Sequence, residues 1–156
     1  MELKIEKVLK DKGIEYRLIE LSQNAFTVAD VIAHSNNAVN PDEICKTIIL
    51  VGRKSGNMIA VMLKGLDKVD FSKVKKLTSE DMTIASPEKV KEASGVEPGA
   101  VCPFLITVPL FVDQEIMSLE RINCGSGHHL RGLEFNVIDL KRGVDYKVAG
   151  LSKQSI

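Results

Sequence analysis

Residues 99–104 combine residue types that fix a backbone loop without offering a side-chain acid or base. Gly99 permits φ values that are closed to other residues, and Pro103 locks its own φ and biases Cys102 toward extended geometry. Three small or apolar residues lie between the glycine and the proline: Ala100, Val101 and Cys102. Such a loop can direct main-chain N–H groups at a ligand carbonyl or hydroxyl, as an oxyanion hole does. The alternative is an ordinary turn before a strand at 105–113, and the loop taken alone favours that alternative.

Lys46 is the single residue that most strongly suggests a functional site, because it lies inside the apolar run 44–51. Burying an unpaired ammonium is expensive. The side chain therefore either reaches water from the end of a strand or points into a site that holds an anion or a carbonyl, and the residues do not decide between these. Thr47, beside it, is most simply explained as a strand residue.

Two adjacent histidines, His128 and His129, follow Cys124 by four and five positions. A zinc site needs three or four converging ligands. Cys102 could be recruited, but nothing in the spacing requires it. We therefore expect no metal site, and we expect the glycine-broken turn at 125–129 to be a polar loop lining a pocket, where one of the histidines could position a substrate.

Composition excludes several classes of protein. The 156 residues include 21 basic and 21 acidic side chains, so no overall charge draws the chain onto nucleic acid or a membrane surface. No apolar run approaches the roughly 20 residues of a membrane span, and GxGxxG, P-loop and GxSxG motifs are absent. The three cysteines are widely spaced without a CxxC pair, which is typical of a reduced, cytoplasmic protein.

Basic residues gather in the middle of the chain, where a solvated helix face is the default interpretation and a phosphate-contacting patch the alternative. They are Arg53, Lys54, Lys64, Lys68, Lys73, Lys75 and Lys76.

The hydrophobic pattern predicts the elements that must position these residues. Helices are expected over residues 3–12, 27–34, 71–77 and 86–95, and strands over 15–21, 44–52, 58–63, 105–113, 121–124 and 133–138. Because helices and strands mix without a regular βαβ rhythm, we expect an α+β fold in which a mixed sheet curls into a barrel-like core with flanking helices. We expect one domain over residues 1–147, followed by a polar, frayed C-terminal tail at 148–156.

Two of the predicted helices should turn an apolar stripe inward. In the helix capped by Thr27 and Asp30, the expected stripe is Val28, Val31 and Ile32. In the helix at 71–77, it is Phe71, Val74 and Leu77.

The order and spacing of several short motifs over residues 3–140 resemble the YbaK/prolyl-tRNA-synthetase-associated editing domain family, the free-standing aminoacyl-tRNA deacylases. The motifs are Phe26 before its helix, the strand lysine at 44–50, the loop Gly99–Pro103 with Phe104, Val112-Asp113, the glycine turn 125–127, Gly132-Leu133-Glu134 and Asp139-Leu140.

The resemblance implies hydrolysis, in trans, of the ester that joins a wrong amino acid to tRNA, here Cys-tRNA(Pro) or Ala-tRNA(Pro). It implies no covalent enzyme intermediate and no cofactor. It gives Lys46 and Gly99 catalytic roles, Lys46 holding the tRNA 3′ end or the substrate. The substrate-contacting residues that it implies are Phe26, Thr47, Ala100, Val101, Cys102, Pro103, Phe104, Gly125, Gly127, His128 and Glu134.

The expected partners are a mischarged tRNA, through its 3′ acceptor end, and prolyl-tRNA synthetase as a candidate; no membrane is expected, and monomer and homodimer both stay open. Three departures leave the edited amino acid open: Leu105 where many members carry glycine, Leu21 where some cysteine-specific members carry tyrosine, and a longer turn at 125–131. The alanine-specific branch uses a late-loop histidine, for which His128 and His129 are both candidates. The rival hypotheses are a non-catalytic tRNA- or synthetase-binding module of the same fold, and a small-ligand-binding domain unrelated to tRNA.

Overall fold

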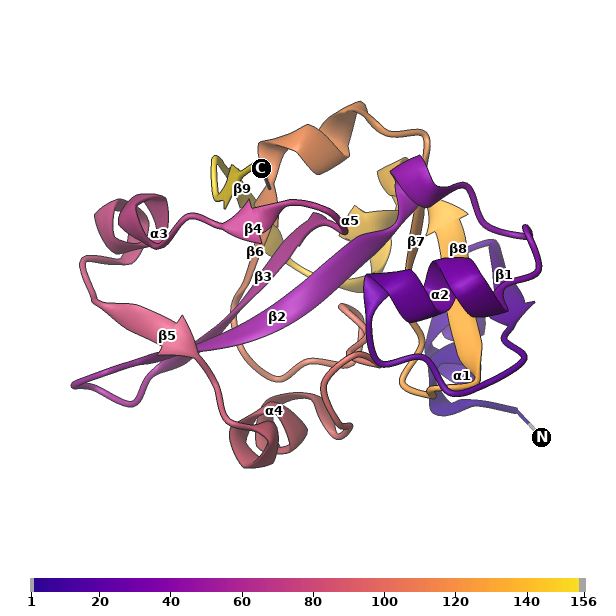
Figure 1. The fold of residues 1–156 in the computed structure, drawn as a ribbon, viewed down its shortest axis with the longest axis horizontal. Coiled ribbons are helices and arrows are strands. Elements are labelled where there is room, and N and C mark those ends of the chain that lie inside the picture. Colours follow the sequence, from indigo (N-terminus) through magenta and orange to yellow (C-terminus); the bar gives the residue numbers. More distant parts are fainter. Residues whose placement is uncertain (1, 155–156) are drawn as a thin grey trace.

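A five-stranded mixed sheet and a three-stranded antiparallel sheet lie next to each other in the computed structural model, which describes residues 2–154 (Figure 1). The strands are β1 (Tyr16–Glu20), β2 (Cys45–Gly52), β3 (Met58–Lys64), β4 (Lys68–Val69), β5 (Met82–Ile84), β6 (Leu110–Asp113), β7 (Arg121–Gly125), β8 (Arg131–Asn136), β9 (Tyr146–Ala149) and β10 (Ser152–Lys153). The helices are α1 (Lys4–Asp11), α2 (Val28–His34), α3 (Phe71–Thr78), α4 (Pro87–Ser94) and α5 (Leu140–Gly143), with 3₁₀ turns η1 (Pro41–Glu43), η2 (Gln114–Ser118) and η3 (Val137–Asp139).

The larger sheet has the order β5-β2-β3-β6-β9. Strand β2 pairs antiparallel with β3, whereas β6 joins β3 and β9 joins β6 in parallel, so the sheet is mixed. The expected α+β class with a mixed sheet is confirmed. The expected barrel is not: over residues 2–154 the sheet ends at β5 and β9 and no closed barrel forms.

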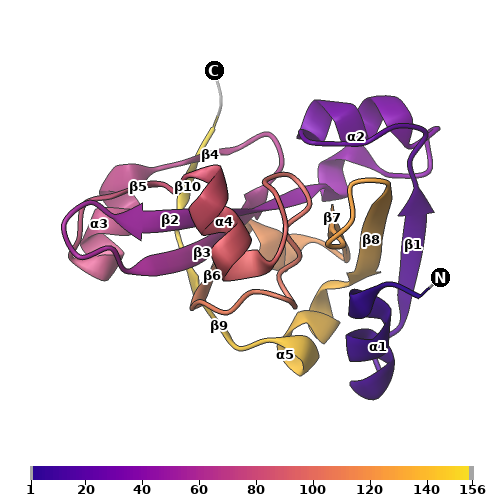
Figure 2. The same cartoon turned by 90° about the horizontal axis from the view of Figure 1, so that it is seen from below.

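The smaller sheet, β1-β8-β7, meets the larger one where β2 begins. An isolated parallel bridge between Ile44 and Asn123 joins the two. In Figure 2, α2 lies on one side of the smaller sheet and α1 on the other. The main core, which includes Ile5 and Leu9 of α1, lies on the α1 side. A smaller apolar cluster lies on the α2 side: Ile19, Leu21, Ala25, Val39 and Ile44, with Val28 and Val31 packed against it.

The capping prediction for α2 is confirmed. Thr27 Oγ1 accepts a hydrogen bond from the Asp30 N–H, and the Asp30 carboxylate accepts from the N–H groups of Thr27 and Phe26. These bonds satisfy donors that a helix start leaves free, and they also fix the backbone of Phe26. The predicted stripe is wrong for Ile32, which is 42% exposed.

Helix α3 corrects a second prediction. Only Val74 is buried, while Phe71 and Leu77 are 38% and 42% exposed. Positions 71 and 77 fall on either side of position 74 on the helix surface, at about 100° per residue, so a helix that touches its neighbours along one line buries the middle residue alone.

Two further strand predictions need correction. The strand expected over 105–113 begins only at Leu110, because the Thr107 N–H bonds to the Ala93 carbonyl of α4 and Pro109 has no N–H to donate. The fraying expected after Lys147 is wrong through residue 154, since β9 and β10 lie there and Leu151 is completely buried. Residues 155–156 of the expected tail lie outside the described residues. None of the helices within 2–154 has the length and apolarity to cross a membrane.

Candidate functional site

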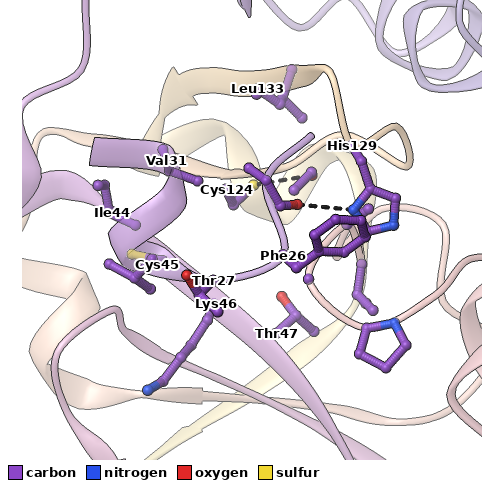
Figure 3. Close-up of a pocket in the computed structure, with 18 of the residues that line it drawn as sticks. Phe26, Thr27, Val31, Ile44, Cys45, Lys46, Thr47, Cys124, His129 and Leu133 are labelled. Carbon is purple, nitrogen blue, oxygen red and sulfur yellow. Dashed lines mark hydrogen bonds between the residues drawn. The ribbon is translucent and has the colours of Figure 1, made fainter. Parts of the chain in front are cut away.

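A cavity of about 300 Å³ opens on the α2 side of the smaller sheet, where β2 begins (Figure 3). Apolar side chains of the small cluster, such as Ile19 and Leu21, line it together with residues 98–101 and the segment before β8. The seam between the two sheets thus holds a pocket instead of a packed core.

The structure brings together eight of the thirteen site residues expected from the sequence. The cavity is lined by Phe26, Lys46, Thr47, Gly99, Ala100, Val101, Gly125 and His128. The other five lie elsewhere: Cys102, Pro103, Phe104, Gly127 and Glu134.

The loop at 99–101 is held by close backbone contacts on two sides. Gly99 has φ +97°, and a Cβ on it would lie 2.5 Å from the Phe26 carbonyl oxygen. A Cβ on Gly125 would collide with the Val101 carbonyl oxygen, and the Gly127 N–H donates to the Ala100 carbonyl at 2.8 Å. Glycine at 99 and 125 therefore lets three backbone segments touch.

Two backbone N–H groups of the loop at 99–101 have no hydrogen-bond partner in the described part of the chain. The N–H groups of Gly99 and Val101 make no hydrogen bond within residues 2–154, although Val101 is buried and both residues line the cavity. The Gly99 residue is exposed, so its N–H is open to water, whereas an unpaired N–H at a buried residue such as Val101 is uncommon in folded proteins. The two N–H groups suit a ligand with a carbonyl or carboxylate oxygen.

Lys46 borders the cavity with a half-buried side chain. Its ammonium makes no ion pair or hydrogen bond to any part of the chain between residues 2 and 154. Burial lowers the pKa of this lysine, partly offset by Asp67. Alternation along β2 turns Lys46 and Thr47 to opposite faces, and Figure 3 shows the Lys46 side chain extending away from Phe26 and His129. An unpaired ammonium at this edge can bind an anionic group.

The two histidines have different surroundings. The Nδ1 atom of His129 lies 2.9 Å from the Ala25 carbonyl oxygen, and its ring packs on Phe26 with centroids 4.4 Å apart (Figure 3). His128 instead accepts the Leu130 N–H on its Nδ1 at 3.0 Å, which stabilises the turn. Both line the cavity, but His129 is the histidine whose ring is oriented by the cavity wall. The sequence could not separate them, because adjacent residues carry the same local signal.

Asn123 is a cavity residue that the sequence did not single out. It is 4% exposed, and its Nδ2 donates to Glu43 at 3.3 Å, while Glu43 also pairs with Arg121. The only sign of Asn123 in the sequence was its polar side chain in the middle of the apolar strand 121–125.

Three buried side-chain atoms on the cavity wall have no hydrogen-bond partner among residues 2–154. They are Thr47 Oγ1, Asn123 Oδ1 and His129 Nε2. Buried polar atoms are normally paired, so these atoms mark positions where a ligand or water completes the site.

Three of the expected residues outside the cavity make contacts elsewhere in the fold. The Phe104 ring packs against Phe135 with centroids 4.9 Å apart. Glu134 binds Arg17, and hydrogen bonds from Arg17 and Asn123 lower the pKa of its carboxyl. Gly127 donates the hydrogen bond described above.

The cysteines are unsuited to nucleophilic chemistry at neutral pH. Cys45, Cys102 and Cys124 are free and buried. Burial raises the pKa of Cys45 and of Cys102 to about 12, and it raises the pKa of Cys124 as well. Since the thiolate is the reactive form, these thiols stay inert. Across residues 2–154, no group of three or more His, Cys, Asp and Glu side chains could hold a metal ion.

Comparison with known proteins places this geometry in a family. The family model of the aminoacyl-tRNA editing domain matches residues 22–142. A proline–tRNA ligase of Shouchella clausii (strain KSM-K16) is 29% identical over 109 residues, which are 69% of this chain and 18% of that enzyme. The chain therefore spans about a fifth of the length of this curated relative.

Two solved structures share the fold. The hypothetical protein APE2540 superposes with a TM-score of 0.86 at 27% identity, over 97% of this chain and 100% of that one. A proposed trans-editing enzyme for prolyl-tRNA synthetase gives a TM-score of 0.81 at 21% identity, over 96% of this chain and 94% of that one. The resemblance drawn from the sequence motifs is confirmed: the chain belongs to the aminoacyl-tRNA editing domain family.

Proposed function

We propose that this protein is an aminoacyl-tRNA deacylase that acts in trans on tRNA(Pro) carrying cysteine or alanine. The observation that carries the proposal is the pair of unpaired backbone N–H groups, Gly99 and Val101, on the wall of a small apolar cavity. The sequence predicts a backbone-donor loop and one buried cation, and the residues of both, Gly99 and Lys46, border this cavity.

Water is the proposed nucleophile. It attacks the carbonyl carbon of the ester, and the Gly99 and Val101 N–H groups stabilise the negative charge that forms on the carbonyl oxygen. The bond between that carbon and the ribose oxygen then breaks, the ribose oxygen takes a proton, and the amino acid leaves as a carboxylate. The protonated cysteines are consistent with a mechanism that lacks an enzyme nucleophile.

Lys46 is proposed to bind the 3′ end of the tRNA. Lys46 borders the cavity, and its ammonium has no partner within residues 2–154 and extends outward, away from Phe26 and His129 (Figure 3). A terminal phosphate or ribose oxygen could reach it there while the aminoacyl group is held inside. The proposed partner is therefore the acceptor end of a free tRNA in the cytoplasm. Prolyl-tRNA synthetase is the proposed source of the mischarged tRNA.

The cavity walls support an uncharged amino acid. A space of about 300 Å³ with mainly apolar walls has room for an aminoacyl group and suits an apolar side chain. Synthetase pockets separate amino acids that differ by one methylene by only about 1–3 kcal/mol, so a second, hydrolytic selection is useful.

The test is deacylation of tRNA(Pro) charged with alanine, cysteine, serine or proline. Wild type should hydrolyse one mischarged species and spare prolyl-tRNA. Lys46→Met should lower that rate roughly tenfold to a hundredfold, the usual value of a charge-assisted contact. Lys141→Met, at an exposed lysine of α5 that does not line the cavity, is the matched control and should retain wild-type activity.

Failure to hydrolyse any species, even with prolyl-tRNA synthetase present, would contradict the proposal. Salt-sensitive tRNA binding without turnover would then favour the non-catalytic binding module.

A further inference from the structure

Three buried hydrogen-bond acceptors without partners in residues 2–154 line the cavity, and they come from different parts of the chain. Thr47 lies on β2, Asn123 on β7, and His129 in the turn before β8. Thr47 and Asn123 are 9% and 4% exposed, so bulk water does not satisfy them freely. Leaving such atoms unpaired is costly, and a ligand in the cavity that all three residues line would satisfy them.

The amide of Asn123 has a defined orientation. Its Nδ2 donates to Glu43 Oε1 at 3.3 Å, and the other oxygen of Glu43 is held by Arg121 Nε at 3.3 Å. Rotating the amide by 180° would bring its oxygen against the Glu43 carboxylate, where two acceptors would face each other. Asn123 Oδ1 is therefore the atom left free, and it can only accept.

A neighbouring carbonyl likewise determines which ring nitrogen of His129 donates a hydrogen bond. A carbonyl oxygen cannot donate, so Nδ1 carries the hydrogen that bonds to Ala25. In the tautomer that carries its hydrogen on Nδ1 alone, Nε2 is an acceptor. The Thr47 hydroxyl can also accept, and Figure 3 shows it pointing toward Phe26, whose ring packs on His129.

The cavity thus offers donors and acceptors on different segments. The Gly99 and Val101 N–H groups are donors, whereas Asn123, Thr47 and His129 present acceptors, and no carboxylate of residues 2–154 lines the cavity. A ligand that fits carries a carbonyl oxygen and, near it, a group rich in N–H donors.

We propose that Asn123 Oδ1, with Thr47 Oγ1 and His129 Nε2, binds the α-ammonium group of the aminoacyl ester. This inference rests on the proposed deacylase function and extends it, because it makes a free α-amino group a condition for rapid hydrolysis. Esters whose α-nitrogen is acylated, such as N-acylaminoacyl-tRNA and peptidyl-tRNA, are then poor substrates. Neutral acceptors bind an ammonium group less tightly than a carboxylate would, which suits a site from which the product amino acid must leave.

The decisive probe replaces the ammonium by a hydroxyl. Alanyl-tRNA(Pro) is compared with lactyl-tRNA(Pro), and cysteinyl-tRNA(Pro) with its 2-hydroxy-3-mercaptopropionyl analogue. All rates are compared after division by the uncatalysed hydrolysis rate of the same ester, because an α-ammonium group itself activates the ester carbonyl toward water. On that scale, the kcat/KM of the edited aminoacyl ester in wild type should exceed that of its hydroxy analogue roughly tenfold to a hundredfold, the value of one or two hydrogen bonds from a charged donor.

Variants of the acceptors should reduce this ratio. Asn123→Leu and the isosteric Thr47→Val should each lower hydrolysis of the aminoacyl ester more than that of its analogue, and Thr47→Ser should restore the ratio. Thr83→Val, on β5 outside the cavity, is the matched control and should keep the wild-type ratio. Thermal unfolding of each variant separates a lost contact from a lost fold.

The outcomes are distinguishable. Equal hydrolysis of the ammonium and hydroxyl esters by wild type would overturn the inference and leave the deacylase function standing; the acceptors would then hold water only. Hydrolysis of neither ester would overturn the proposed function, and the inference with it.

Discussion

Two sets of buried polar groups in this molecule differ in how completely they are paired. The carboxylate of Asp113, at the end of β6, is 1% exposed and accepts from Leu151 N–H at 2.8 Å, Ser152 N–H at 3.2 Å, Ser152 Oγ at 2.9 Å and Glu115 N–H at 3.3 Å. The cavity atoms of Thr47, Asn123 and His129 are equally shielded, and none of the residues 2–154 pairs with them.

The difference separates structural from functional polar groups. Asp113 belongs to one of the motifs that carry the family resemblance, yet it lies outside the cavity and ties the C-terminal segment to the sheet. Asn123 belongs to no motif that the sequence suggested, yet it lines the cavity. Lack of pairing together with a place on the cavity wall, and not membership of a motif, tells which polar residue is available to a ligand; the unpaired Tyr146 hydroxyl lies outside the cavity.

The largest expected effect comes from breaking the paired set. Asp113→Ala should lower the free energy of unfolding by about 4 kcal/mol, because it leaves the buried N–H groups of Leu151 and Ser152 without an acceptor. Urea unfolding measures the change. The exposed Asp145, changed to alanine, is the control and should alter stability by no more than about 0.5 kcal/mol.

A loss below about 1 kcal/mol in Asp113→Ala would mean that these N–H groups find other acceptors or water. The Asp113 carboxylate would then not be what holds residues 148–154 in place. Pairing would no longer distinguish a structural polar group from one available to a ligand.

The next largest effect concerns the loop that presents the free donors. Gly99→Ala should destabilise the protein by about 3 kcal/mol, since it adds a left-handed alanine at φ +97° and a collision with the Phe26 backbone. Gly56→Ala has φ +74° and open space around its Cβ, so it carries the backbone strain alone, about 1 kcal/mol. The difference between the two variants measures the contact between Gly99 and Phe26.

Chemical denaturation of both variants gives that difference, and deacylation assays show whether the loop moves. Equal losses for Gly99→Ala and Gly56→Ala would indicate that the loop shifts away from Phe26 at little cost. The close approach would then not fix the Gly99 and Val101 donors.

The fold was predictable where local patterns determine it. Alternation and capping located β2, β3, α2 and α4, because Thr27, Ser86 and Gly95 act through neighbours three or four residues away. The C-terminal strands were missed since one buried leucine and a distant aspartate fix them, and a polar segment gives no local sign of either. The strand before Leu110 was overextended because its N-terminal half bonds to α4 instead of a strand.

The site was predictable only in part for a related reason. Gly99 and Lys46 are unusual in their own segments, so sequence alone drew attention to them. Phe104 has the same local signal as a pocket residue and lies in the core, and the choice between His128 and His129 depends on the carbonyl of Ala25, more than a hundred residues away. Asn123 gains its role from Glu43, on another element.

The smallest expected effect, and the opposite in sign, comes from removing an unpaired charge. Lys46 is half-buried without a partner within residues 2–154, so the folded state holds its ammonium at a cost. Lys46→Met should therefore raise the free energy of unfolding near pH 7, by less than about 1 kcal/mol because water screens the exposed half of the side chain. The same substitution should abolish most of the deacylase activity proposed above, so stability and activity change in opposite directions.

The lowered pKa of Lys46 determines how the stability advantage of Lys46→Met changes with pH. Burial lowers the pKa of Lys46 in the folded state, whereas the unfolded chain keeps the ordinary value of about 10.4. Below the folded pKa both states are protonated and the cost is present in full; as pH rises through the folded pKa the native state releases its proton first, and the cost disappears. The stability advantage of Lys46→Met should thus be largest near neutral pH and shrink in alkaline solution, as thermal melts between pH 7 and pH 10 would show, with Lys141→Met as the exposed control. An advantage that does not change with pH would trace the effect to packing of the methionine, and a loss of stability would mean that Lys46 already has a favourable partner in the folded protein.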